Sequence, residues 1–451
     1  MGAYVSREGC LAHYGVDIRC DTLPANGSRI EQIGPYRRGQ WPTDPDIAGI
    51  GVLGAFLAVT VASLVLSVLS MAWWWAKNIL HVKKKFREEE KAVRPGAISV
   101  TAIFEVLVIT CSDQQIFTGG AYAITLRYVT GCQISAYHYN IVANMLLITC
   151  ATHLMAITVT RNYWEHAVLG VIRVVVTSLI FLVTGMLLSN QSAAGAGFPT
   201  QIPPADHDYS DMLLNAACFQ SGEGGFTNSV QQSLSTGGNF FDSRIPGWSQ
   251  FLVMLFFYIA AVLMRCGRVV RAGRNKGGRR ARLVGWTKKT FSLLYTPSAQ
   301  WILRLVYGIY LVVGVTISGW TVGTSSYYVF ALRDWVDKSG WIERSGNLNP
   351  ENDPWSFGQL VPLLLMSLTL YTFIQVISEQ VEARRTRRKA WKRRDQEAQE
   401  LAAAAAAAAA GSRDSDNKEM VVEETEKSAY DRPSDKPASD PAPPQPSTSS
   451  S

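Results

Sequence analysis

Residues 47–75 read IAGIGVLGAFLAVTVASLVLSVLSMAWWW, and no charged residue interrupts them. A bilayer core of about 30 Å is crossed by about 20 mostly apolar helical residues, so this stretch predicts a membrane-spanning helix. Other apolar blocks follow along the chain, at residues 113–130, 139–160, 167–189, 248–264, 301–322 and 358–378. The sequence therefore predicts an all-α polytopic bundle of about seven transmembrane spans, with the lipid bilayer as its main partner.

The segment before the first span, residues 1–46, is polar and contains Pro and Gly. A cleavable signal peptide has a shorter apolar region, so we expect the first span to stay in the protein as an anchor. The formal net charge is +7. The basic residues lie beside span ends, as is typical of membrane proteins, and we expect no nucleic-acid partner.

Lys and Arg near the span ends predict the orientation. Three connecting segments are rich in them, at residues 77–94, 265–289 and 384–394. Basic connectors resist translocation, so these segments are predicted to be cytosolic. The N-terminus is then outside and the C-terminus in the cytosol. The membrane is expected to be the plasma membrane, with another secretory-pathway or vacuolar membrane as the alternative.

The sequence contains seven cysteines, of which four lie in predicted outer segments: Cys10, Cys20, Cys132 and Cys218. An even number of cysteines in an oxidising compartment favours disulfides. We expect the pairs Cys10–Cys20 and Cys132–Cys218, the second of which would fix a long outer loop to the third span. The spacing alone leaves other pairings open.

Several segments outside the spans have a marked composition. The sequons at Asn26 and Asn190 are predicted to be glycosylated on the outer side. The outer loop at residues 190–247, rich in Gly, Ser, Asn and Pro, is expected to be irregular. Residues 379–410 are rich in Arg, Lys, Glu and Ala and predict a cytosolic helix, whereas residues 411–451 predict a disordered tail.

A longer apolar stretch, from Ala97 to Val129, is interrupted by a polar group, Ser112-Asp113-Gln114-Gln115. A Ser followed three residues later by Gln is the capping-box pattern, and Asp113 would suit the positive end of a helix dipole. This favours an interfacial helix at residues 97–111, followed by a span at residues 113–130. The alternative is one long helix with the polar group near mid-membrane, where Asp113 would need a buried partner.

Three short motifs occur in this region: SDQQIFTG at residues 112–119, CQISAYHYNIV at 132–142 and THL at 152–154. Together they resemble a large family of fungal integral membrane proteins of unassigned function, whose usual patterns are SDQQLVTG and CSISxYHF. The chain departs from these patterns mildly, at residues 116–117, 133 and 139. The resemblance covers about residues 97–189. It implies a fungal multi-pass membrane protein and carries over no activity.

Polar residues inside spans are costly and are therefore the first functional candidates. We predict an inner polar cluster that ties the second, third and fourth spans together: Asp113, Gln114, Gln115, His153, Arg161 and Arg173. The alternative for these residues is static packing, in which each hydrogen bond contributes only about 1 kcal/mol. Three outer polar residues are candidates for facing a ligand: His138, Asn140 and Asn144.

The predicted topology favours a receptor-like or sensor protein with a small-molecule ligand at its outer face. A cytosolic protein partner would bind the basic loop at residues 265–289 and the helix at residues 379–400. A transporter or channel is the alternative, although no repeated halves are evident. An intramembrane hydrolase is the least favoured class, because His138 and His153 lie about 22 Å apart along one helix and no His follows in the later spans. No catalytic residue, cofactor or metal site is expected.

Overall fold

The computed structural model describes residues 6–24, 30–78, 100–126, 132–160, 163, 167–193, 197–220, 246–275, 297–344, 346 and 348–426. The chain divides into two compact units, residues 1–382 and 383–451. The first unit contains a helical bundle. Its elements are α3 (Ile50–Asn78), α5 (Val100–Thr125), α6 (Ala136–Val159), α7 (Ala167–Ala193), α9 (Trp248–Asn275), α11 (Pro297–Ser339) and the first part of α12 (Phe357–Glu426).

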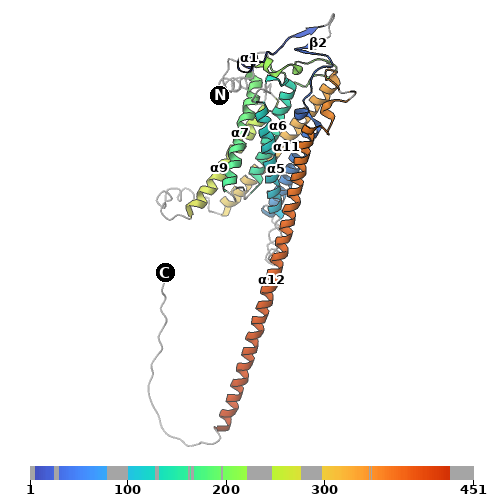
Figure 1. Ribbon diagram of the computed structural model, residues 1–451. Helices are drawn as coiled ribbons and strands as arrows, with labels where there is room; N and C mark the ends of the chain where they lie inside the picture. Colours follow the sequence, from blue (N-terminus) through green and yellow to red (C-terminus); the bar gives the residue numbers. More distant parts are fainter. Residues whose placement is uncertain are drawn as a thin grey trace. The chain divides into compact units, whose positions relative to one another are not determined.

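Helix α6 is the centre of the bundle. Each of its 24 residues is buried, and it packs against α3, α5, α7, α9 and α11. Figure 1 shows α6 running beside α5, α7 and α11. Ser135 caps its N-terminus, with the hydroxyl oxygen accepting a hydrogen bond from the backbone N–H of His138. Because α6 has no lipid-facing side, every polar residue on it needs a partner inside the protein.

Five helical segments in the described residues are long and apolar enough to cross a membrane: Pro45–Ala76, Ala136–Val159, Val168–Ser189, Leu305–Ser339 and Gly358–Ala406. Trp248–Met264 is a shorter apolar helix. The chain is therefore mostly helical, and several of its helices are suited to crossing a membrane. The remaining predicted block, residues 113–130, lies partly in α5, whose apolar run includes Glu105, Asp113 and two Gln residues. Seven crossings, and their orientation, stay a prediction.

The predicted break at Ser112 is wrong. Helix α5 continues from Val100 to Thr125, so the polar group Ser112–Gln115 lies in its interior, and the described residues of the predicted interfacial helix at 97–111, from Val100 on, belong to the same helix. At 1.5 Å per residue the helix is about 39 Å long, enough to span a bilayer. The reason is that these polar side chains bond to neighbouring helices instead of capping a helix end. The alternative considered from sequence, one long helix, is the one that the structure has.

A cap covers the end of the bundle at which α3 and α6 begin. We define the cap as the described residues of 6–49, 132–135, 197–220 and 340–356. Its regular elements are α1 (Arg7–Tyr14), β1 (Thr22–Pro24), β2 (Ile30–Ile33), β3 (Tyr36–Arg37), α2 (Pro45–Ala48), η2 (Asp211–Leu213), η3 (Ala216–Phe219) and η6 (Pro350–Asn352). The strands form an antiparallel sheet in the order β1-β2-β3, which the expectation of an all-α chain missed.

Backbone hydrogen bonds join the distant segments of the cap. The Trp41 N–H donates to the Trp341 carbonyl, and the Glu343 N–H donates to the Trp41 carbonyl, both at 2.9 Å. The Ala136 N–H donates to the Leu214 carbonyl at 2.8 Å. The N-terminal segment, the loop after α7 and the loop after α11 therefore meet over the start of α6.

The second unit contains the later part of α12, which ends at Glu426. The described side chains of residues 385–406 are exposed, with 387 left out. The helix passes through Gly411, where the sequence predicted its end and the start of a disordered tail. A single Gly costs only about 1 kcal/mol relative to Ala, so its presence alone does not end a helix. Residues 427–451 lie outside the described part, as do residues 276–289 of the predicted basic loop, whose residues 265–275 belong to α9.

Candidate functional site

Two disulfides fix the cap, and their pairing differs from the predicted one. Cys10 is bonded to Cys132, and Cys20 is bonded to Cys218. The predicted pairs Cys10–Cys20 and Cys132–Cys218 are therefore wrong. Each bridge instead joins the N-terminal segment to a connector 122 or 198 residues later in the chain.

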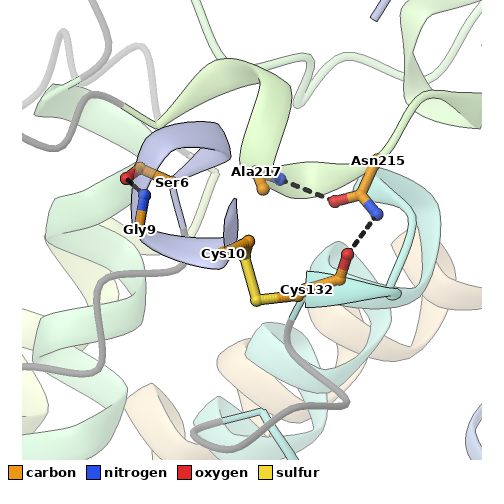
Figure 2. Close-up of a disulfide and its surroundings, with 6 residues drawn as sticks. All are labelled: Ser6, Gly9, Cys10, Cys132, Asn215 and Ala217. Carbon is orange, nitrogen blue, oxygen red and sulfur yellow. Dashed lines mark hydrogen bonds between the residues drawn. A yellow bond between two sulfur atoms is a disulfide. The ribbon is translucent and has the colours of Figure 1, made fainter. Parts of the chain in front are cut away.

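The surroundings of the first bridge explain this pairing (Figure 2). Cys10 is buried on α1 in a small apolar cluster with Ile18, Cys132 and Ala217. Asn215 holds the other two segments together: its side-chain NH₂ group donates to the Cys132 carbonyl at 2.7 Å, and its side-chain oxygen accepts from the Ala217 N–H at 2.9 Å. This packing brings residues 132 and 218 to the N-terminal segment, so closeness in sequence does not decide the pairing.

A cavity of about 410 Å³ lies inside the cap. Residues 16–19, 33–36, 41–44, 132–135 and 213–215 line it, together with Ile47 and His138. Cys132 is thus a wall residue as well as a disulfide partner. The segments that the two bridges connect are the segments that enclose the cavity, so the bridges fix its walls.

His138, in the first turn of α6, lies in the wall of this cavity, as predicted for an outer ligand-facing residue. Both ring nitrogens have partners: Nδ1 lies 2.9 Å from the Ser135 hydroxyl, and Nε2 lies 3.3 Å from Glu351 Oε1. The ring stacks on Trp41, with centroids 5.4 Å apart and planes 4° apart. His138 therefore presents ring surface to the cavity.

Behind His138 lies a buried charged group that sequence analysis missed. Glu351 is 1% exposed, and its Oε2 accepts a hydrogen bond from the Tyr137 hydroxyl at 3.0 Å and lies 3.9 Å from Arg333 Nε. The Asn349 side chain, which caps η6, accepts the Glu351 N–H at 2.9 Å. Glu351 thereby links α6, α11 and the loop before α12. Nothing in its local sequence separates it from the other acids of a net acidic connector.

Asp44 is the acid closest to the bundle in the cavity wall. It caps α2, with its carboxylate accepting the Asp46 N–H at 3.1 Å. Burial raises the pKa of Asp44 above its ordinary value of 3.8, and the nearby His138 opposes this rise. Within the described ranges no Lys or Arg forms an ion pair with it.

Asn140 and Asn144 do not line the cavity, so the structure does not place them beside a ligand there. Asn140 donates to the Pro199 carbonyl at 2.8 Å and accepts a hydrogen bond from the Gln191 side chain at 2.7 Å. Asn144 donates to the Asn140 carbonyl one turn earlier in α6. Both are buried, and Asn140 alone of the two bonds to α7 and to the loop after it, since the bond of Asn144 stays within α6. The sequon residue Asn26 lies outside the described residues, and of Asn190 only the helical backbone, within α7, is described.

The polar group inside α5 is the second candidate, and its four side chains reach four different helices. Ser112 Oγ lies 2.6 Å from His153 Nδ1 on α6. Arg173 on α7 donates two hydrogen bonds to the Asp113 carboxylate, at 2.7 and 2.5 Å. Gln114 bonds to Thr369 on α12. Gln115 donates to the Phe56 carbonyl at 2.9 Å and to the Thr60 hydroxyl at 3.1 Å, both on α3.

The predicted inner cluster is therefore only partly one group. Asp113 and Arg173 meet, but His153 contacts Ser112 instead of Asp113, and the two Gln side chains point to other helices. Arg161 lies outside the described residues. Successive residues of a helix point about 100° apart, so four in a row radiate outward. This rotation could have been applied to the sequence, whereas the partners Thr60 and Thr369 had no local signal.

Comparison with models of protein families, with curated proteins and with solved structures found no match. The resemblance of the sequence motifs to a fungal membrane family thus stays a prediction. Among the described residues, no three His, Cys, Asp or Glu side chains gather as a metal site requires.

Proposed function

We propose that this protein is a receptor-like sensor of a fungal membrane, namely the plasma membrane. In this proposal the cap is outside the cell and the C-terminus is in the cytosol. Its ligand is a small molecule that occupies the cap cavity. The observation that supports this most is the placement of α6: His138 at its start lines the cavity, and His153 farther along contacts the polar group of α5. Both ends of one buried helix thus carry polar contacts that a ligand could change.

Helix α6 suits the role of transmitter because it is packed on every side. Close-packed interiors respond to a shift at one point by repacking at another rather than by deforming smoothly. A ligand that displaced the His138–Trp41 stack would move the first turn of α6. That movement would change the Ser112–His153 contact and, through α5, the geometry of the Asp113–Arg173 ion pair.

A second route leads from the same histidine to other helices. His138 contacts Glu351, and the Glu351 carbonyl accepts hydrogen bonds from Arg333 of α11 at 3.2 Å and from Gln359 of α12 at 3.3 Å. Gln359 in turn accepts the Gly51 N–H of α3 at 2.8 Å. Occupation of the cavity would therefore bias four helices that start or end beneath the cap.

The output would be read by a cytosolic protein. The described side chains of residues 388–394 include three Arg and two Lys, and all are exposed. An exposed basic helix is suited to an acidic protein surface. The predicted partner sites are this helix, residues 379–400, and the basic loop at residues 265–289.

The test is a deletion strain profiled across nutrients, pH, lipids and drugs, followed by complementation with full-length variants. Thr43→Trp introduces a bulky side chain at the cavity wall without replacing a core residue. Gln40→Trp places the same side chain at an exposed position that does not line the cavity. We expect Gln40→Trp to restore the wild-type response and Thr43→Trp to fail at equal protein level at the membrane. Equal rescue by both variants would show that the cavity is not needed for the response. Solute flux in vesicles containing the purified protein would favour a transporter instead of a sensor.

A further inference from the structure

We infer that the cap cavity binds a compact organic cation, an ammonium group carried on a hydrocarbon body, with Asp44 as the counter-charge. This inference rests on the proposed function, because it names the class of ligand for the same cavity. It is carried by three properties of the walls: their apolar surface, the engagement of the His138 and Trp41 ring nitrogens, and the charge of Asp44, with which no Lys or Arg of the described residues forms an ion pair.

The size and surface of the cavity suit a small molecule with an apolar part. Its volume of about 410 Å³ falls in the usual range for small-molecule sites, roughly 300–1,000 Å³. Ile18, Ile33, Ile47 and Leu213 are buried and contribute apolar surface to its walls. A hydrocarbon body would remove this surface and its own from water, which favours binding.

The aromatic wall residues leave few donors for an anion. Both nitrogens of His138 are engaged by Ser135 and Glu351, and the Trp41 indole N–H donates to the Leu213 carbonyl at 2.9 Å. A carboxylate or phosphate ligand would have to break one of these bonds to use either ring as a donor.

The charges in the wall point the same way. Asp17 and Arg19 are exposed, lie two residues apart and carry opposite charges that offset each other. Asp44 is half-buried, and within the described residues it has backbone N–H partners and no ion pair. A carboxylate that burial alone disfavours gains from an opposite charge placed beside it. An ammonium group at Asp44 would supply that charge.

The experiment uses the full-length protein in nanodiscs and three probes of matched size: 2-phenylethylammonium, 2-phenylethanol and phenylacetate. Binding is measured by titration calorimetry and by the ligand-induced rise in Tm. We expect the ammonium to bind about tenfold or more tightly than the alcohol, and the carboxylate to bind most weakly.

Asp44→Asn is the decisive variant, because Asn caps a helix as well as Asp does, so α2 keeps its cap while the charge is lost. We expect it to abolish the preference for the ammonium and to leave binding of the alcohol unchanged. Asp46→Asn is the matched control, since Asp46 is exposed and outside the cavity wall. It should keep the preference.

Two results would overturn the inference: absence of ammonium binding to the wild type, or tightest binding of phenylacetate that Arg19→Gln abolishes. Neither result contradicts the sensor proposal, because the comparison of Thr43→Trp with Gln40→Trp does not depend on the charge of the ligand. If those two variants rescued equally and the ammonium preference were intact in vitro, the cavity would be a binding site that has no role in sensing.

Discussion

Arg173 of α7 donates two hydrogen bonds to the Asp113 carboxylate of α5, Nε to Oδ1 at 2.7 Å and Nη2 to Oδ2 at 2.5 Å. The paired geometry matches the planar guanidinium to the carboxylate, which is the strongest arrangement that such an ion pair adopts. Asp113 lies in the middle of the long apolar helix, where an unpaired charge is costly. The pair therefore lowers the cost of placing Asp113 inside this apolar helix.

Removing one partner should cost more than removing both. Arg173→Met leaves the Asp113 carboxylate unpaired and is expected to lose about 3 kcal/mol of unfolding free energy, as is Asp113→Leu. The double variant should recover most of this loss, giving a coupling of about 1–3 kcal/mol in a double-mutant cycle measured by unfolding in micelles. Lys338→Met is the control, because its pair with Asp334 is exposed on both sides and should contribute almost nothing. If Asp113→Asn changes neither stability nor the strain's phenotype, the polar group has no role.

Helices α5 and α6 approach closely at Gly119, where an added Cβ would lie 2.9 Å from both Cγ2 and Oγ1 of Thr149. Gly119→Ala should therefore lose about 1–3 kcal/mol through overpacking. Thr149→Ala removes both of these atoms and should restore stability in combination. The neighbouring Gly120 has nothing within 4 Å of its Cβ position, so Gly120→Ala should be neutral. Equal effects at residues 119 and 120 would show that the contact is not tight.

The crossed disulfides can be mapped directly by mass spectrometry of non-reduced peptides, which should yield Cys10 with Cys132 and Cys20 with Cys218. Each bridge closes a long loop, so losing one should cost about 4 kcal/mol. Cys20→Ser and Cys218→Ser should be equivalent, and the double variant no worse than either. Cys111→Ala, at a buried free cysteine, is the control for losing a thiol. Recovery of a Cys10–Cys20 peptide would contradict the structure.

Glu351 should tolerate loss of its charge better than loss of its side chain. Glu351→Ala leaves the Tyr137 hydroxyl, His138 Nε2 and the Arg333 guanidinium without their acceptor, and buried unpaired groups of this kind cost about 1–3 kcal/mol each. Glu351→Gln keeps an oxygen in place and should be milder. The measurement is the Tm of thermal unfolding, which should be lower for Glu351→Ala than for Glu351→Gln. Glu343→Ala, a change at an exposed acid of the same connector, should be near neutral.

Asp44 should make the stability of the cap depend on pH. Burial raises its pKa in the folded protein above 3.8, so the folded state holds this proton more tightly than the unfolded chain does. The resulting stabilisation is present below pH 3.8 and is lost as pH rises through the raised pKa. Asp44→Asn lacks this titration, so its Tm relative to the wild type should improve as pH rises from about 4 to 7. A difference in Tm that stays constant over this range would contradict the raised pKa.

The sequence predicted the elements that hydropathy controls. Each predicted apolar block is helical over most of its described residues, because a long run of apolar residues has few other stable forms in lipid. The break at Ser112 was predicted wrongly because a capping box and a row of interhelical contacts have the same local sequence. The meeting of Asp113 with Arg173 could be foreseen from charge and depth. The contact of His138 with Glu351 could not, because it depends on how a distant connector folds over α6.

The crossed bridges also set an order of events during synthesis. Cys10 and Cys20 are translated first and stand close together, while their partners emerge only after 122 and 198 further residues respectively. A bond between the two early cysteines is the first that chemistry permits, yet it must be absent or undone in the finished protein. If the two early cysteines do pair first, thiol–disulfide exchange must undo that bond, and a chain in which the exchange failed would keep Cys132 and Cys218 apart from the N-terminal segment.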